Sequence, residues 1–119
     1  MPRACQSMHE LRYSPEFEKD FAKLKAKTLR GDGEARYLLG LIEKATTKLA
    51  ENREAGKKIP RKLWPLEYVR KYDVTNPWKL SLDSYWRLIY TLLGDQVNLF
   101  LICLEWMDYK EYDRKFKYR

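Results

Sequence analysis

Positions 78–92 read Trp78-Lys79-Leu80-Ser81-Leu82-Asp83-Ser84-Tyr85-Trp86-Arg87-Leu88-Ile89-Tyr90-Thr91-Leu92, with large apolar residues at every second position on both sides of a polar turn. An alternation of period two places one set of side chains on each face of a strand. We therefore predict a β-hairpin that turns at Asp83-Ser84 and has one apolar face. Lys79 and Arg87 are out of phase with the apolar set, so we expect both cations on the opposite face of the sheet.

The stretch that follows the hairpin is almost wholly apolar. Residues 97–104 read Val-Asn-Leu-Phe-Leu-Ile-Cys-Leu and come after a tight turn that we expect at Gly94-Asp95. Such a run suits a central strand that is covered on both faces. Residues 63–75 fit a short helix and an irregular strand equally well, so their structure stays open.

Two amphipathic helices are predicted ahead of the sheet. After a short strand candidate at residues 11–13, Ser14-Pro15 offers a capping hydroxyl and a proline that suits the first turn of a helix. Gly31-Asp32-Gly33 ends this helix, Asp32 caps the next one, and Gly56 closes it. Helices followed by a meander of strands predict an α+β domain rather than a parallel βαβ fold.

The length and charge of the chain indicate one basic domain. We expect residues 1–119 to form a single domain in which residues 1–9 are a flexible N-terminus. The chain has 24 Lys and Arg against 17 Asp and Glu, a formal net charge of +7. This balance favours polyanionic partners such as RNA, although a positive charge also serves to keep a protein in solution.

The cysteines and the hydropathy pattern indicate the compartment. Cys5 and Cys103 are far apart and have no CxxC or CxxxH partner, so neither a disulfide framework nor a zinc site is predicted. The N-terminal residues lack the apolar run of a signal peptide, and no stretch approaches membrane-spanning length. We expect a cytoplasmic protein with no membrane partner.

Common catalytic motifs are missing from the sequence. It contains no GxxxxGK[ST], GxGxxG, HExxH or GxSxG pattern. The single histidine, His9, lies in the expected flexible terminus and is interpreted as an incidental surface residue. The carboxylates alternate with lysines on helix faces, as they do on solvated helices. We therefore expect no metal and no cofactor, and a metal-dependent nuclease is disfavoured.

Cations and aromatic rings gather in two further segments. Residues 57–62 hold four cations around Pro60 and form either a basic binding loop or a solvated connector. In the segment 108–118, Tyr109, Tyr112 and Phe116 can share one helical face, as a packing stripe or as rings that stack on bases. Cations that bind phosphates and rings that stack on bases are together what recognition of single-stranded RNA requires.

Arg87 is the most informative single residue. It lies between Trp86 and Leu88 in a predicted strand, and a buried guanidinium must be hydrogen-bonded, paired or turned toward a ligand. A salt bridge to Glu105 or Asp83 and a functional role are equally good interpretations of Arg87 from its neighbours alone.

Four segments taken together resemble the RelE-type toxins of type II toxin-antitoxin systems. They are Tyr13-Ser14-Pro15-Glu16-Phe17, Trp78-Lys79-Leu80, Tyr85-Trp86-Arg87-Leu88-Ile89-Tyr90 and Asp108-Tyr109-Lys110-Glu111-Tyr112-Asp113-Arg114. The similarity spans roughly residues 10–119. It implies a RelE/ParE-like α+β fold, in which two N-terminal helices pack on a small antiparallel β-sheet and a short helical segment ends the chain.

The resemblance also implies an activity. RelE-type toxins are mRNA interferases: metal-independent, ribosome-dependent endoribonucleases that cut messenger RNA in the A site by attack of the 2′-hydroxyl and so inhibit translation. This chemistry needs a base, cations around the phosphorane and a proton source for the leaving oxygen. By position, the implied catalytic residues are Arg87, Lys62, Lys58, Tyr112 and Tyr109, and the implied RNA-binding residues are Lys57, Arg61, Lys79, Lys110 and Arg114.

One departure concerns proton transfer. Many relatives have histidine where this chain has Tyr109, and tyrosine is a far poorer proton donor or acceptor near neutral pH. Tyr112 or Lys110 could serve instead, or catalysis could be slow or lost.

The resemblance implies partners and leaves two other functions open. The expected partners are messenger RNA, the ribosome and an acidic, partly disordered antitoxin, with operator DNA contacted only through that antitoxin. The first alternative is a ParE-like toxin that shares the fold but inhibits DNA gyrase, for which the cationic loop and tail should be dispensable. The second is a non-catalytic module that binds RNA or an antitoxin.

Overall fold

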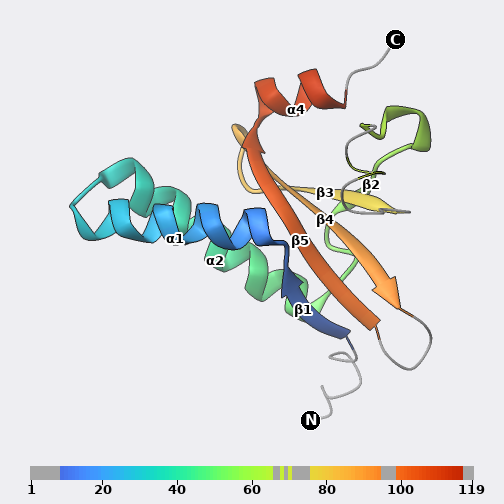
Figure 1. Ribbon diagram of the computed structural model, residues 1–119, viewed down its shortest axis with the longest axis horizontal. Coiled ribbons are helices and arrows are strands. Elements are labelled where there is room, and N and C mark those ends of the chain that lie inside the picture. The colour runs from blue at the N-terminus through green and yellow to red at the C-terminus, as the bar shows by residue number, and fades with distance from the viewer. Residues whose placement is uncertain (1–8, 66–67, 69, 71–75, 95–98, 117–119) are drawn as a thin grey trace.

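The computed structural model describes residues 9–65, 68, 70, 76–94 and 99–116. The elements follow the chain in the order β1 (His9–Tyr13), α1 (Pro15–Leu29), α2 (Gly33–Glu51), β2 (Lys57–Lys58), a 3-10 turn η2 (Arg61–Leu63), β3 (Pro77–Ser81), β4 (Trp86–Gly94), β5 (Leu99–Asp108) and α4 (Tyr109–Lys115). The strands form one five-stranded sheet in the order β1-β5-β4-β3-β2. The α1–α2 hairpin lies on one side of the sheet and α4 beside the far end of β5 (Figure 1). The predicted α+β class is confirmed.

Local capping fixes where the two long helices begin, as the sequence predicted. The Ser14 hydroxyl accepts from the Phe17 amide at 3.0 Å and donates to the Leu104 carbonyl at 2.6 Å, which ties the start of α1 to β5. Gly31 adopts a φ of 92°, which glycine tolerates best, and the Asp32 carboxylate accepts from the Ala35 amide at 3.0 Å.

The end of α2 differs from the prediction. The helix stops at Glu51 with Asn52 as its C-cap, so Gly56 does not close it. Gly56 instead lies where the chain passes closely against β3: a Cβ there would overlap the carbonyl oxygen of Lys79. The glycine is required by close approach of two backbones rather than by helix termination.

The predicted hairpin is present, and its strands continue into an antiparallel meander. The expectation that it has only one apolar face is wrong, because Ile89 on the opposite face is fully buried in a second hydrophobic cluster. β3 pairs with β4 in the register Trp78↔Tyr90 and Ser81↔Arg87, and β4 pairs antiparallel with β5. The edge strand β1 pairs with β5 in parallel, so the sheet is mixed rather than wholly antiparallel. Of the turn expected at Gly94-Asp95, only Gly94 is among the described residues. Most of residues 63–75, whose structure the sequence left open, also lies outside them.

The N-terminal boundary shifts slightly. β1 begins at His9, one residue inside the segment that we expected to be flexible, and His9 pairs with Leu99. Residues 1–8, which include Cys5, lie outside the described residues.

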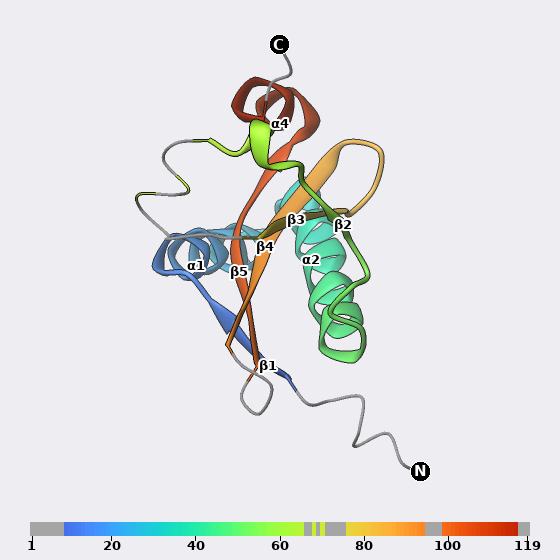
Figure 2. The ribbon, with the colours of Figure 1, turned by 90° about the vertical axis from the view of Figure 1, so that its right-hand side faces the viewer.

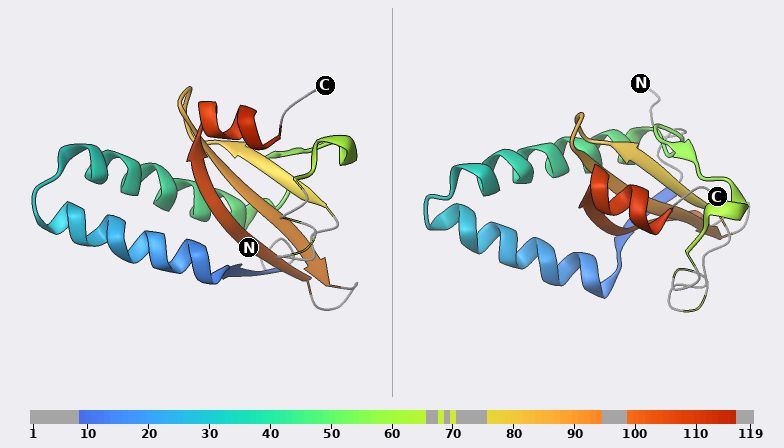
Figure 3. Two further views of the ribbon diagram at one scale, coloured as in Figure 1. Left: turned by 45° about the horizontal axis from the view of Figure 1, so that its top comes forward. Right: turned by 90° about the horizontal axis from the view of Figure 1, so that it is seen from above.

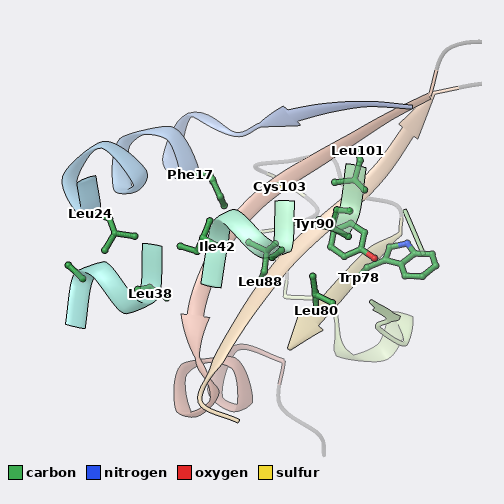
Figure 4. Close-up of a cluster of buried hydrophobic side chains, with 13 residues drawn as sticks. Phe17, Leu24, Leu38, Ile42, Trp78, Leu80, Leu88, Tyr90, Leu101 and Cys103 are labelled. Carbon is green, nitrogen blue, oxygen red and sulfur yellow. The ribbon is translucent and has the colours of Figure 1, made fainter. Parts of the chain in front are cut away.

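Two hydrophobic clusters cover the two faces of the sheet. On the first face, side chains of β3, β4 and β5 pack against α1 and α2, with Ile42, Leu88 and Cys103 fully buried (Figure 4). Burial raises the pKa of the Cys103 thiol to about 12. The second cluster lies on the other face and includes Ile89, Leu104 and Phe116. Figures 2 and 3 show α4 and η2 on the side of the sheet away from the α1–α2 hairpin.

In the part of the chain that the structure describes, no helix is both long and apolar enough to cross a membrane.

Candidate nucleic-acid interface

Three cations lie on the sheet face that α4 covers. Lys57 in β2 is directly opposite Lys79 in β3, and Lys79 is opposite Ile89 in β4. Arg87 is two residues before Ile89 and therefore points to the same face, as a diagonal neighbour of Lys79. We call this surface, which bears Lys57, Lys79, Arg87 and the α4 residue Tyr112, the α4 face. The prediction that Lys79 and Arg87 project away from the apolar set is confirmed.

Tyr112 contacts the middle cation of this set. The Lys79 ammonium lies 4.8 Å from the centroid of the Tyr112 ring. The Tyr112 ring is itself buried and stacks on Phe116 at a centroid distance of 4.7 Å. A cation over a ring face contributes about 0.5–2 kcal/mol. The Tyr112 ring of α4 therefore contacts the cations of this face directly, through Lys79.

Arg87 is half-buried and held by backbone carbonyls. Its Nη1 donates to the carbonyl oxygen of Asp83 at 3.0 Å and to that of Trp86 at 3.2 Å. Among the described residues it forms no ion pair with the carboxylate of Asp83 or Glu105, the two partners considered from the sequence. A guanidinium has five N–H donors, so Arg87 keeps donors for an anion.

The Asp83 carboxylate builds the turn that precedes Arg87. Its Oδ1 accepts from the amides of Tyr85 at 2.9 Å and Trp86 at 2.8 Å, and its Oδ2 accepts from the Tyr37 hydroxyl at 2.8 Å. These bonds, that of the Trp86 amide foremost, hold the pKa of Asp83 below its usual value. The turn is thereby tied to α2 through Tyr37.

Glu105 anchors α4 to the sheet. It pairs with Ile89 across the strands, and its carboxylate accepts hydrogen bonds from the Tyr68 hydroxyl and from Lys115 Nζ, the latter at 3.3 Å. Lys115 is also 3.9 Å from the Glu111 carboxylate in the same helix. The sequence analysis did not predict that Glu105 holds α4 on the sheet, because it considered Glu105 only as a salt-bridge partner of Arg87.

The basic loop is divided between the two faces of the sheet. Lys58 pairs with Trp78, and its ammonium lies 5.7 Å from the Trp78 ring, which belongs to the cluster under α1 and α2. Lys58 is therefore not brought to the α4 face, although Lys57 is. The burial of Ile59 in the second cluster shows the phase, because residues 57 and 59 of an extended chain point to the same side.

The remaining cations of the loop and the tail are peripheral. Arg61 and Lys62 are exposed in η2, and the Arg61 guanidinium lies 5.7 Å from the Trp64 ring. Lys110 and Arg114 are exposed on α4. Tyr109 is not buried beside Tyr112 but packs against Tyr85 at the outer end of α4.

Within the described ranges, no group of three or more His, Cys, Asp and Glu side chains is arranged to hold a metal ion.

A family model described as "ParE toxin of type II toxin-antitoxin system, parDE" matches residues 11–102. The chain belongs to this ParE toxin family. The matched region of the ParE family includes Lys57, Lys79 and Arg87 but ends within β5, ahead of α4. Membership in a toxin family of type II systems implies an antitoxin partner. The resemblance to the RelE/ParE superfamily that the sequence motifs indicated is confirmed.

A solved structure shares the ParE-family fold. It is a YoeB/ParE toxin from Agrobacterium tumefaciens, which aligns with a TM-score of 0.52 and 16% sequence identity over 83% of this chain and 97% of that chain. No curated protein sequence matches the chain.

Proposed function

We propose that this ParE-family toxin is an endoribonuclease that cuts ribosome-bound messenger RNA on its α4 face. The observation that carries the proposal is the convergence of Lys57, Lys79 and Arg87 on one face of the sheet, with Tyr112 against Lys79. Lys79 lies next to Lys57 and diagonally to Arg87, so it is repelled by both like charges, and an RNA phosphate relieves that repulsion.

The proposed reaction needs no group beyond the chain and its RNA substrate. The 2′-oxygen loses its proton and forms a bond to phosphorus, while the bond from phosphorus to the 5′-oxygen breaks and that oxygen takes up a proton. The products are a 2′,3′-cyclic phosphate and a 5′-hydroxyl. Arg87 and Lys57 stabilise the charge on the phosphorane, and Lys79 and Tyr112 are the groups we assign to proton transfer.

The distribution of the other sequence candidates refines these roles. Arg61, Lys62, Lys110 and Arg114 are exposed around the α4 face and fit phosphate contacts along the strand rather than chemistry. Lys58 lies on the opposite face and has no part in the proposed reaction.

The family match favours a second candidate function, inhibition of DNA gyrase. The matched region, residues 11–102, contains neither Tyr109 nor Tyr112. A gyrase inhibitor would need the shared fold but not the pairing of α4 with the cations. If the protein is the proposed nuclease, it should not inhibit supercoiling of a plasmid by purified gyrase.

A reconstituted translation reaction tests the proposal. Protein freed from its antitoxin is added, and new 5′ ends on the message are mapped with and without ribosomes. We expect cuts at translated codons with wild type, none with Arg87→Ala, and wild-type cutting with Arg36→Ala, an exposed arginine on α2. Arg87→Lys keeps the charge but not the planar fork and should retain only partial activity. If the message stays intact and supercoiling is inhibited, the protein is a gyrase inhibitor and the nuclease proposal is wrong.

A further inference from the structure

Two tyrosine rings stand exposed beside the start of β4. Tyr85 and Tyr109 are 40% and 38% exposed, and their ring centroids are 5.5 Å apart at an interplanar angle of 77°. Tyr85 directly precedes β4 and Tyr109 is the first residue of α4, and Figure 1 shows these two places next to each other. Segments far apart in the sequence therefore present one aromatic surface.

The two rings are held in place by the surrounding structure. The Tyr109 amide donates to the Tyr85 carbonyl oxygen at 2.7 Å, and the Tyr85 hydroxyl is 3.4 Å from Oδ2 of Asp108. The Tyr85 ring also meets the Trp86 ring edge-to-face at 5.1 Å. Rings that are already ordered lose little entropy when a flat ligand stacks on them.

The charge around this surface indicates the class of ligand. Arg87 follows Tyr85 by two residues and keeps guanidinium donors for an anion, while the exposed Lys110 adjoins Tyr109. The nearby Asp108 carboxylate caps α4 by accepting from the Glu111 amide at 2.8 Å. Aromatic rings beside cations bind single-stranded nucleic acid, because the rings stack on bases and the cations contact phosphates. An apolar protein segment would gain nothing from the cations.

We propose that Tyr85 and Tyr109 form a subsite that stacks an unpaired nucleobase of RNA whose phosphate lies toward Arg87. This inference rests on the proposed function, since the base belongs to the same RNA that the α4 face cuts. It adds a contact that selects a splayed-out base next to the scissile phosphate. Tyr85 is new in this role, and for Tyr109 the proposal favours base stacking over proton transfer, the other role considered from the sequence.

An uncleavable RNA separates base stacking from phosphate binding. The probe is a fluorescein-labelled, 2′-O-methylated single-stranded oligonucleotide, compared with the same backbone carrying abasic sites, and binding to the antitoxin-free protein is followed by anisotropy. Wild type should bind the intact oligonucleotide roughly tenfold more tightly than the abasic one. Tyr85→Leu and Tyr109→Leu should each remove most of this difference and leave affinity for the abasic strand unchanged.

Matched variants control for folding and for exposure. Tyr13, 37% exposed, stacks on Phe17 on the helix side of the sheet, so Tyr13→Leu should leave both affinities unchanged. Tyr85→Phe and Tyr109→Phe keep the rings and should retain binding of the intact strand. If a leucine variant does not fold, the affinities of wild type for the intact and the abasic strand still show whether a base is bound.

The outcomes distinguish this subsite from the proposed function. Equal affinity of wild type for the two strands, or no binding of either, overturns the subsite. Leucine variants that lose affinity for the antitoxin while keeping the preference for the intact strand also overturn it and make the surface a protein contact. If wild type prefers the intact strand but does not cleave message, the base-stacking subsite stands and the proposed nuclease activity is wrong.

Discussion

The Nη1 atom of Arg87 donates a hydrogen bond to the backbone carbonyl oxygen of Asp83 at 3.0 Å, across the turn that the Asp83 carboxylate itself organises. The orientation of the guanidinium on the α4 face therefore depends on the shape of this turn. The Asp83 carboxylate forms no hydrogen bond with Arg87, but the two opposite charges attract and help to lower the pKa of Asp83. The carboxylate sets the orientation of the guanidinium mainly by shaping the backbone of the turn.

Loss of the Asp83 side chain should reduce activity through Arg87. In Asp83→Ala the amides of Tyr85 and Trp86 lose their acceptor, and we expect message cleavage to fall by roughly tenfold because the Arg87 guanidinium is no longer held in its productive position. Asp83→Asn retains an oxygen that can accept from both amides and should cut at close to the wild-type rate. Equal rates for Asp83→Ala and wild type in the translation reaction would show that the turn does not position Arg87.

The same carboxylate predicts a pH dependence of stability. Its folded pKa is lowered, so its contribution to stability is present above the unfolded pKa and is lost as pH falls through the folded pKa. The melting temperature of wild type should therefore fall more steeply than that of Asp83→Asn between about pH 5 and about pH 3. Because Asp83 is close to solvent, we expect a small difference. Parallel curves would argue against the hydrogen-bonded turn.

Two glycines should respond to alanine in opposite directions. Gly56→Ala puts a Cβ against the Lys79 carbonyl and the Tyr90 hydroxyl, and we expect it to lower the free energy of unfolding by roughly 1–3 kcal/mol. Gly40 lies inside α2 with open space where an alanine methyl group would lie, so Gly40→Ala should raise that free energy by up to about 1 kcal/mol. Urea unfolding of both variants checks the pair, and a neutral Gly56→Ala would contradict the close approach of the Gly56 backbone to β3.

Removal of Glu105 should loosen α4. Glu105→Ala takes away the acceptor of the Tyr68 hydroxyl and of Lys115, so we expect faster hydrogen exchange in residues 110–115 and a loss of roughly 1–3 kcal/mol. Glu111→Ala is the control, because its carboxylate is 43% exposed and 3.9 Å from the same lysine. An exposed pair at that distance contributes at most about 1 kcal/mol. Unchanged exchange in Glu105→Ala would show that apolar packing alone holds the helix.

The sequence predicted the parts of the fold that depend on neighbours in the chain. Ser14-Pro15 and Asp32 satisfy amides within their own first turns, and the alternation in residues 78–92 sets the phase of both hairpin strands. The placement of Lys79 and Arg87 followed from that phase alone. These features need no knowledge of the tertiary structure.

The parts that were missed depend on contacts distant in the chain. Nothing in residues 9–13 indicates a parallel pairing with β5, and Gly56 resembled a helix end because its close neighbour, the Lys79 carbonyl, is remote in sequence. From the sequence, Lys57 and Lys58 were not assigned to opposite faces of the sheet. The apolar Ile59 was a signal for this, because it predicts burial of its own side of the strand, which it shares with Lys57. Tyr85 became a candidate only when the structure placed it against Tyr109.

The neighbours Lys57 and Lys58 give the most direct test of the claim that the α4 face acts on RNA. They have the same charge and similar exposure, but Lys57 lies opposite Lys79 on the α4 face and Lys58 lies over Trp78 on the other. The measurement is the rate of message cleavage in the translation reaction for Lys57→Ala and Lys58→Ala. On this claim we expect a rate at least about fivefold lower for Lys57→Ala, from loss of a phosphate contact, and a near wild-type rate for Lys58→Ala. An equal loss in both variants, or a loss confined to Lys58→Ala, would contradict it.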